Sequence, residues 1–402
     1  MTINKTATAG QNISFVNDIE AEFGSGGKVN ETRRLGKYRR DDAGFRNKNV
    51  GEMTNMPLDK EGNFPTSGQI KFSDFCGRQL NVVISYDVNQ NNPLSGSAKF
   101  DGNNEKTVVG GFRSASSVTS SQGTRVTLHV HDGVSIGSQK GTSTSEESRY
   151  RSALTTGNGW ETDTELDINI AGTVCGGGGN GGQGSEDPAN IGDGRPGLNG
   201  NSAIGISYNV ETLTLQSGGI IRAGAGGGGG AGSGREDSDT PGRRGGGGGG
   251  GGGAGIPAGD GGIAREHGSE PFAGGSPGAA GGGLNAGGNG GNGGNQGDEA
   301  FGGGGGGGGA FVSGGGGSGG VRGGDGDGPD PSDGNAGGTN GNGGGGGKGG
   351  RTDEGERSFG GSGGQPGYSI IRTNNATYSQ FNNNGDLLGS QVVVSGDVSG
   401  EF

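Results

Sequence analysis

The sequence predicts a mainly β protein that carries a large glycine-rich domain in place of a conventional core. Glycine supplies 110 of the 402 residues, and most of it follows Ala171. The chain before that point contains alternating apolar segments, which are typical of half-buried strands. Hydrophobic residues amount to only 25% of the chain, too few for one large apolar core.

Composition divides the chain into four regions. We expect a polar N-terminal region over 1–80 and a strand-rich domain with stacked repeats over 81–222. A bundle of glycine-rich helices of the polyproline-II type is expected over 223–366, followed by a C-terminal β-hairpin over 367–402. The bundle is expected to begin where the glycine content rises, after 222, and to end where it falls, at 366.

Two short segments of the N-terminal region resemble each other. They are "ISFVNDIEAEFG" (13–24) and "IKFSDFCG" (70–77), each with Ile-x-Phe, then Asp, an apolar residue and a closing Gly. Asp is a favoured N-cap, and glycine commonly ends a helix. We therefore expect Asp18 to cap a short helix over 19–23 that Gly24 ends.

A longer repeat lies in the strand-rich domain. The segments "LDINIAGTVCGG" (166–177) and "LTLQSGGIIRAG" (213–224) align without gaps, so that Leu166 matches Leu213. "LHVHDGVSIG" (128–137) is a looser third copy. Each copy contains a strand, a glycine turn and a second short strand. Such repeats predict stacked β rungs that bury one another's faces.

The last apolar segments predict the hairpin. "YSIIRTNNATYSQF" and "DLLGSQVVVS" flank the turn-forming stretch "NNNGD". An Asn-Gly pair between two strand-like segments is a strong hairpin signal.

Glycine blocks dominate the rest of the chain, and three interpretations compete for them. A flexible linker is the simplest, because ordering glycine is entropically costly. Collagen needs Gly at every third position and abundant proline, whereas this chain has only 12 prolines. The third is a packed bundle of glycine helices. The blocks are 176–182, 224–232, 245–255, 281–294, 302–309, 314–320, 341–350 and 360–364.

We favour the packed bundle. A polyproline-II helix has three residues per turn and no internal hydrogen bonds, so bare helices packed side by side can bond to one another. In "GGNGGNGGN" (287–295), Asn289, Asn292 and Asn295 then share one edge. The pure glycine of 245–253 suits the centre. The glycines expected to pack in the bundle are Gly228, Gly249, Gly290, Gly305, Gly316 and Gly345.

Charge and apolar patterning exclude several function classes. The net charge of -12 argues against nucleic acid or an anionic membrane as the main partner. We interpret the local basic run "RRLGKYRR" (33–40) as a solvated face or an assembly contact. No stretch could span a bilayer, and "MTINKTATAGQ" lacks the apolar part of a signal peptide, so we expect synthesis in the cytoplasm. Cys76 and Cys175 are expected to be free thiols.

Catalytic and metal-binding patterns are weak. His129 and His131 share a strand face, but no further ligand is evident. "GGGGGKGG" (343–350) lacks the Ser or Thr of a P-loop, and "GGDGDGPDPSDG" (323–334) fits no calcium-loop spacing. We expect no enzyme activity, no metal and no cofactor.

Two long segments carry a family resemblance. Glycine blocks separated by variable loops, preceded by "NGNSAIGISYNVETLTLQSGGIIRAGAGGGGGAG", resemble the tip adhesins of T-even-type bacteriophage long tail fibres. The closing "GGQPGYSIIRTNNATYSQFNNNGDLLG" resembles the C-terminal segment of many phage fibre proteins with such glycine tracts. "PTSGQIKFSDFCG" and "SFVNDIEAEFG" resemble a motif near the start of fibre-type proteins of marine phages. Together these likenesses cover most of the chain.

The resemblance implies a virion protein at the tip of a tail fibre, made in the host cytoplasm. Its glycine helices would form a sandwich whose loops bind a host-surface receptor, either an outer-membrane protein or a polysaccharide. Residues 1–120 differ from the T-even pattern and would attach to other tail or fibre proteins in their own way. Tail fibres are commonly homotrimers, whereas a T-even-type adhesin is a single copy.

If successive helices run antiparallel, the loops alternate between two ends. One set would be 233–244, 295–301 and 321–340, and the other 256–280, 310–313 and 351–359. Aromatic residues of the second set would form either a recognition tip or a plug against the β domain. Candidate receptor-binding residues are Arg235, Asp237, Arg243, Phe301 and Arg322 in the first set, and His267, Phe272, Phe311, Arg351 and Phe359 in the second.

Two other functions compete with adhesion. A purely structural virion component, such as a spacer or decoration protein, could use the same bundle. An ice-binding protein is a further alternative, because glycine helix bundles also occur in a small antifreeze family. Its flat, regular face is at odds with the long charged loops of this chain.

Overall fold

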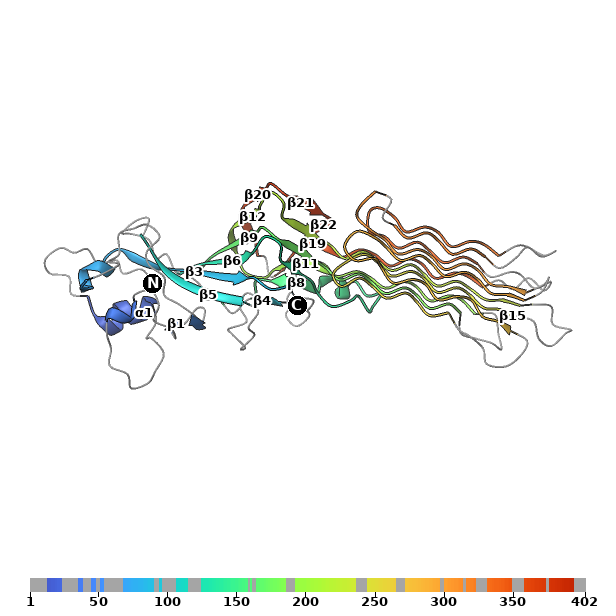
Figure 1. Ribbon diagram of the computed structural model, residues 1–402, viewed down its shortest axis with the longest axis horizontal. Coiled ribbons are helices and arrows are strands. Elements are labelled where there is room, and N and C mark those ends of the chain that lie inside the picture. The colour runs from blue at the N-terminus through green and yellow to red at the C-terminus, as the bar shows by residue number, and fades with distance from the viewer. Residues whose placement is uncertain are drawn as a thin grey trace.

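The molecule is elongated, with the N-terminal region, the strand-rich domain and the glycine-rich threads following one another along its length (Figure 1). In this computed structural model, strands predominate and α-helix is almost absent from the described residues. The structure describes residues 13–23, 35–38, 45–47, 51–53, 68–89, 94–95, 106–114, 124–157, 160, 164–185, 192–235, 244–264, 272–296, 300–313, 316–322, 331–348, 358–373 and 376–393.

The two related N-terminal segments form short helical turns. A π-helical turn over Phe15–Glu20 continues into α1 (Ala21–Phe23), and a 3-10 turn covers Phe72–Phe75. Asp18 does not cap a helix that begins at residue 19, because the helical segment already begins at Phe15. Its carboxylate instead accepts the N–H of Ser14 at 2.6 Å, just as Asp74 accepts that of Lys71.

Aromatic side chains hold these turns together. Phe23, Tyr38 and Phe75 are buried, and their rings meet mostly edge to face at centroid distances of 5.4 to 6.3 Å. Tyr38 belongs to a 3-10 turn over Leu35–Tyr38. A separate antiparallel pair joins β1 (Phe45–Asn47) and β2 (Gly51–Met53).

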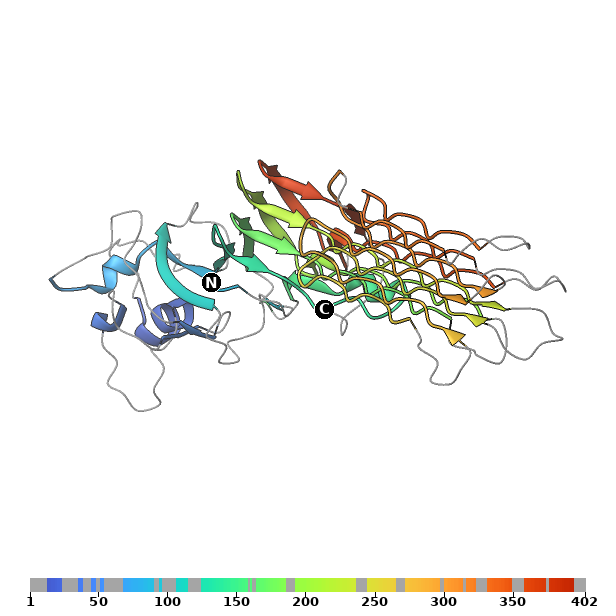
Figure 2. The same ribbon diagram turned by 45° about the vertical axis from the view of Figure 1, so that its right-hand side comes forward.

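The strand-rich domain is a three-sided stack of parallel rungs (Figure 2). The orders of the three sheets are β20-β12-β9-β6-β3-β5, β21-β13-β10-β7 and β22-β19-β11-β8-β4. The four rungs that begin at β6, β9, β12 and β20 place one strand in each sheet, whereas the described residues of the first rung form only β3 and β4. All pairs in these sheets are parallel except β3 with β5. The strands are β3 (Arg78–Tyr86), β4 (Leu94–Ser95), β5 (Lys106–Ser114), β6 (Arg125–Val130), β7 (Ser135–Ile136), β8 (Ser152–Thr155), β9 (Glu165–Ile170), β10 (Thr173–Cys175), β11 (Ser202–Ile206), β12 (Val210–Leu215), β13 (Ile220–Arg222), β19 (Tyr368–Arg372), β20 (Tyr378–Asn383), β21 (Asp386–Leu388) and β22 (Ser390–Val393).

Stacking of alternate side chains forms the apolar core. In β6, every second residue is buried, and Leu128 lies opposite Ile168 of β9. Ile168 in turn lies opposite Leu213 of β12. The predicted rungs are confirmed, but the ungapped alignment, which matches Ile168 to Leu215, is wrong for this strand. The turn after β12 is two residues longer than the turn after β9, so the alignment holds only in the second strand, where Val174 lies opposite Ile221.

The predicted C-terminal hairpin is also wrong. β20 pairs in parallel with β12, and β21 pairs in parallel with β13. The segment is therefore one more rung of the stack. The "NNNGD" stretch turns the chain from one sheet to the next, as Gln216–Gly219 does in the rung before. A turn signal alone does not distinguish these two outcomes.

The glycine-rich threads leave the stack between the second and third strands of two rungs. One excursion, 176–201, joins β10 to β11, and a much longer one, 223–367, joins β13 to β19. The first excursion bonds to the second, since the Gly179 N–H donates to Ala225 at 2.8 Å. The bundle therefore includes residues that the expected boundary at 222 assigns to the strand-rich domain. The described threads are 176–185, 192–201, 223–235, 244–255, 258–264, 274–283, 287–296, 302–310, 316–322, 331–338, 342–348 and 358–367.

Backbone bonds in the bundle repeat every three residues. In thread 244–255, the N–H groups of Gly248, Gly249 and Gly250 donate to three different threads at 2.8 to 3.1 Å. The N–H of Gly251 returns to the thread that Gly248 reaches. The carbonyls of the same residues accept from three further threads. The six neighbours of thread 244–255 are 176–185, 223–235, 258–264, 274–283, 287–296 and 302–310.

Threads 223–235, 244–255 and 302–310, here called the central threads, bond to one another and are each surrounded by neighbours. This agrees with the prediction that side-chain-free blocks lie in the centre. A Cβ on Gly249 would collide with the carbonyl oxygen of Gly262. Gly228, Gly290, Gly305 and Gly316 are equally confined by carbonyl oxygens, whereas a Cβ on Gly345 would meet nothing closer than 3.5 Å.

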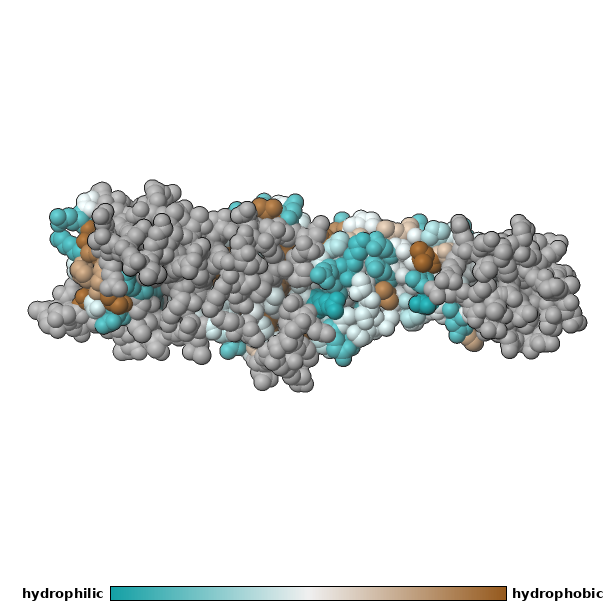
Figure 3. Space-filling model, turned by 90° about the horizontal axis from the view of Figure 1, so that it is seen from below, coloured by the Kyte–Doolittle hydropathy of each residue, from teal (hydrophilic) through white to brown (hydrophobic). Residues whose placement is uncertain are grey.

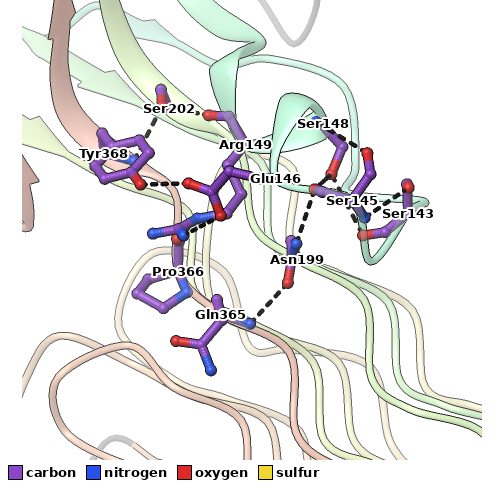
Figure 4. A network of polar contacts seen from close by, with 10 residues as sticks. All are labelled: Ser143, Ser145, Glu146, Ser148, Arg149, Asn199, Ser202, Gln365, Pro366 and Tyr368. Atoms are coloured by element: carbon purple, nitrogen blue, oxygen red, sulfur yellow. Dashed lines mark hydrogen bonds and ion pairs between the residues drawn. The ribbon is translucent and has the colours of Figure 1, made fainter. Parts of the chain in front are cut away.

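A polar network joins the bundle to the stack (Figure 4). The Arg149 side chain donates to the carbonyl oxygen of Pro366 at 2.6 Å and lies over the Tyr368 ring at 4.3 Å. The Tyr368 hydroxyl donates to Glu146 at 2.5 Å. Burial and this hydrogen bond raise the pKa of Tyr368 to about 12. The network fixes the point where the last thread re-enters the stack.

Candidate functional site

The end of the bundle farthest from the stack, here called the far end, gathers chain segments from many parts of the sequence (Figure 1). Threads that run away from the stack end there, and returning threads begin there. The segments 186–191, 236–243, 265–271, 297–299, 323–330 and 349–357 each join two such thread ends, and they lie outside the described residues.

The expected division of the loops between two ends is wrong for three segments: 256–280, 321–340 and 351–359. The last was expected at the same end as 310–313, but it follows the outward thread 342–348 and so belongs to the far end. The segment 256–280 contains the outward thread 258–264, a crossing at the far end and part of the inward thread 274–283. The segment 321–340 likewise contains the inward thread 331–338. These threads escaped the sequence interpretation because they carry Asp, Ile, Asn, Ser or Ala between glycines. One glycine every third residue is enough where a thread has few neighbours.

Phe311 lies at the opposite end, next to the stack. It packs against the buried Ala225, Ala254 and Ala310. Its ring also occupies the space that a Cβ on Gly341 would need. Of the two roles considered for the aromatic residues, this geometry supports the plug for Phe311.

Short strands bring three of the candidate residues together at the far end. Arg235 lies in β14 (Gly234–Arg235), Phe272 in β16 (Phe272–Ala273) and Phe301 in β18 (Ala300–Phe301). β15 (Arg244–Gly245) pairs with both β14 and β16. β17 (Asn295–Gln296) pairs with β18, and the two small sheets lie next to each other.

Phe359 and Arg322 also lie beside the far end. The Phe359 side chain is 52% exposed, and the Lys348 ammonium lies 5.7 Å from its ring. Arg322 is more restrained, because its guanidinium donates to the carbonyl oxygen of Pro331 at 3.2 Å. The remaining candidates lie outside the described residues; they are Asp237, Arg243, His267 and Arg351.

The structure adds two residues to this end that sequence reasoning missed. Ile263 is 56% exposed and Val321 is 59% exposed, and each lies one residue before the end of its thread. Figure 3 shows apolar surface beside the far end on one face of the bundle. A large apolar residue inside a glycine thread, where Asn, Ser or Ala is usual, is the signal that could have identified them.

Candidate metal ligands do not gather in the part of the chain that the structure describes. No set of three or more His, Cys, Asp or Glu residues is placed to hold a metal ion there. His129 and His131 do lie together, with ring centroids 4.4 Å apart, but on the stack. Cys76 and Cys175 are free thiols, as expected, and burial raises the pKa of Cys175 to about 12.

Comparison with known families decides the identity. The family model described as phage tail fibre adhesin Gp38 matches residues 98–302, half of the chain. The chain belongs to the phage tail fibre adhesin family. The match runs from just before β5 to the first residue of the central thread 302–310, so it covers the strands from β5 to β13 of the stack and the first seven described threads of the adhesin's bundle. No curated protein and no solved structure matches the adhesin.

Family membership sets the biological context. A tail fibre adhesin is a virion protein of the phage tail that acts in host recognition. Among the described residues, no helix of the adhesin has the length and apolar character needed to cross a membrane.

Proposed function

We propose that the adhesin binds a host-surface receptor, an outer-membrane protein or a polysaccharide, through the far end of its bundle. The observation that carries this proposal is the convergence of thread ends at one extremity of an elongated molecule (Figure 1). Loops held by a rigid scaffold are common binding elements, because they can vary without disturbing the core. The function is binding and not catalysis.

The scaffold, in this proposal, is a sandwich of polyproline-II-type glycine helices. The three-residue repeat of its hydrogen bonds supports this, since that helix has three residues per turn. Ordering each residue costs about 1–2 kcal/mol, against about 0.5–1.5 kcal/mol for each net hydrogen bond. The bundle can therefore be stable only if its threads are densely hydrogen-bonded to one another. The central threads, each bonded to six neighbours, satisfy this condition.

The N-terminal region is proposed to attach the adhesin to other tail or fibre proteins. It lies at the opposite extremity from the far end (Figure 1). Val16 and Phe72 are each 42% exposed there, and Phe72 packs on Phe15 with a centroid distance of 6.2 Å. Exposed apolar residues that cluster at one place are typical of a protein interface.

An adsorption experiment tests the receptor-binding proposal. The purified full chain, added to host cells first, should block adsorption of the phage. Exchanging residues 265–271 for the corresponding loop of a phage with another host should change which cells are protected. Leu284→Ser, in a turn next to the stack, is the matched control and should leave blocking unchanged. A full chain that binds no host cell would instead favour a structural role in the virion.

A further inference from the structure

The bundle has three corners, and each carries one large exposed apolar residue next to the far end. Two threads at each corner bond to only one central thread: 258–264 and 274–283 to 244–255, 316–322 and 331–338 to 302–310, and 192–201 and 358–367 to 223–235. We call 258–264, 316–322 and 358–367, one from each corner, the corner threads. Ile263, Val321 and Phe359 lie on these three threads, each within two residues of the thread end. The three side chains therefore form an apolar rim around the far end.

Each corner thread is joined to a parallel neighbour by a recurring contact. At one corner, the Gly293 N–H donates to the carbonyl of Val321 at 2.9 Å. The Val321 N–H donates in return to the side-chain oxygen of Asn292 at 2.9 Å. An Asn side chain and the N–H of the following Gly thus bind the N–H and the carbonyl of one residue, and we call this contact an Asx–Gly clamp.

The clamp recurs along all three corners. Asp193–Gly194 holds Phe359, with the Phe359 N–H donating to the Asp193 carboxylate at 2.6 Å and the Gly194 N–H to Phe359 at 2.8 Å. The other clamps are Asn289–Gly290 on Ser318, Asn180–Gly181 on Asp260, and Asn199–Gly200 on Gln365, the last visible in part in Figure 4.

Two further pairs form only the backbone hydrogen bond of the clamp and lack its side-chain hydrogen bond. The Gly178 N–H donates to the carbonyl of Pro257, but Pro257 has no N–H to donate in return. Gly177 stands at the position that Asn or Asp occupies in a complete clamp. Gln183–Gly184 faces Ile263, and only the backbone bond from Gly184 forms, at 3.0 Å. The Gln183 side-chain oxygen is one carbon farther out and is buried without a hydrogen-bond partner.

We propose that Ile263, Val321 and Phe359 contact the receptor and that the clamps on Val321 and Phe359 position two of them. Because the three residues lie at different corners, only a partner that approaches end-on touches all three. Aliphatic Ile and Val side chains gain little from sugar hydroxyls, but they gain from burial against apolar groups. The partner chemistry is therefore an apolar patch on a protein. This inference rests on the proposed function.

A triple substitution tests the rim. Ile263→Ser, Val321→Ser and Phe359→Ser combined in the full chain should weaken adsorption blocking at least tenfold. Val88→Ser is the matched control, because Val88 is 48% exposed but lies just after β3 of the stack and belongs to no thread of the bundle, and it should block normally. Unchanged blocking by a folded triple variant would overturn the rim. Cells treated with protease should lose binding of the wild-type chain; loss after periodate treatment alone would overturn the protein-surface assignment.

The clamp has its own readout, independent of the receptor. Asp193→Ala should speed amide exchange at Phe359 several-fold and weaken blocking, whereas Asp193→Asn keeps an acceptor oxygen and should restore both. The Gly194 amide, bonded to the Phe359 carbonyl, serves as an internal reference. Wild-type exchange at Phe359 in Asp193→Ala would overturn the positioning role. Failure of the wild-type chain to bind cells would contradict the proposed function. The amide-exchange test would still decide whether the clamp positions Phe359.

Discussion

The stack and the bundle stabilise extended chain in opposite ways. In the stack, alternate side chains of two-residue period enter an apolar core, and Leu128, Ile168 and Leu213 lie one above another. In the bundle, the period is three, and the buried material is backbone. The first solution tolerates many apolar residues at each position, while the second tolerates almost none but glycine. Side chains that distinguish one part of the bundle from another can therefore lie only on its surface.

The largest expected effect comes from placing a side chain at the centre of the bundle. Gly249→Val would drive a branched side chain into the carbonyl of Gly262 and separate threads on several sides. We expect loss of the bundle's cooperative melting and of host adsorption. Thermal unfolding and amide exchange over 224–364 measure this. Wild-type melting in this variant would contradict close packing of the central threads.

A smaller effect is expected from truncating a side chain in the stack. Leu128→Ala leaves a cavity between rungs and should cost about 2–5 kcal/mol of unfolding free energy. Denaturant unfolding followed by a probe in the stack measures the loss. If the bundle retained its exchange protection in this variant, the two regions would be shown to unfold separately; parallel losses would show that they are coupled.

Alkaline pH should loosen the junction between the two regions. The pKa of Tyr368 is raised from 10.0 in a free tyrosine to about 12, chiefly by burial and then by its bond to Glu146. A raised pKa means that the folded state holds the proton more tightly, so the stabilisation is complete below pH 10 and is lost between pH 10 and 12. Tyr368→Phe should reduce this slope in unfolding experiments. An equal slope in both proteins would assign the alkaline loss to other groups.

The smallest effect is expected at a perimeter glycine. Gly345→Ala meets no atom closer than 3.5 Å and should change stability by less than about 1 kcal/mol. The neighbouring Gly344→Ala, whose Cβ would collide with the carbonyl of Asn335, should be clearly destabilising. Similar melting temperatures for the two variants would mean that the perimeter threads separate easily.

Much of this fold follows from the sequence, but its connectivity does not. Alternation in "RVTLHVH" and the repeat at 166–177 predicted the rungs, and the runs of pure glycine predicted the central threads. Threads such as 192–201 could not be recognised, because glycine at every third position also occurs in ordinary loops. The register of Ile168 against Leu213 depends on turn length, which a local alignment does not constrain.

The candidate site was predictable only in outline. The resemblance implied that loops between threads bind the receptor, but the end to which each loop belongs depends on counting every thread. One unrecognised thread, 331–338, was enough to place Phe311 with Phe359, although these residues lie at opposite ends of the bundle. The apolar rim was missed because Ile263 and Val321 have no local signature apart from their glycine neighbours.

Insertion of the long excursion within a single rung has a consequence for biosynthesis. The third strand of that rung, β19, follows the whole excursion in the chain, and the final rung follows β19. A ribosome must therefore synthesise the whole excursion, 223–367, before the rung that opened at β12 can close. Chains that terminate within the excursion would lack β19 to β22 and leave the apolar side chains of β12 uncovered, so the stack matures only after the bundle has been synthesised.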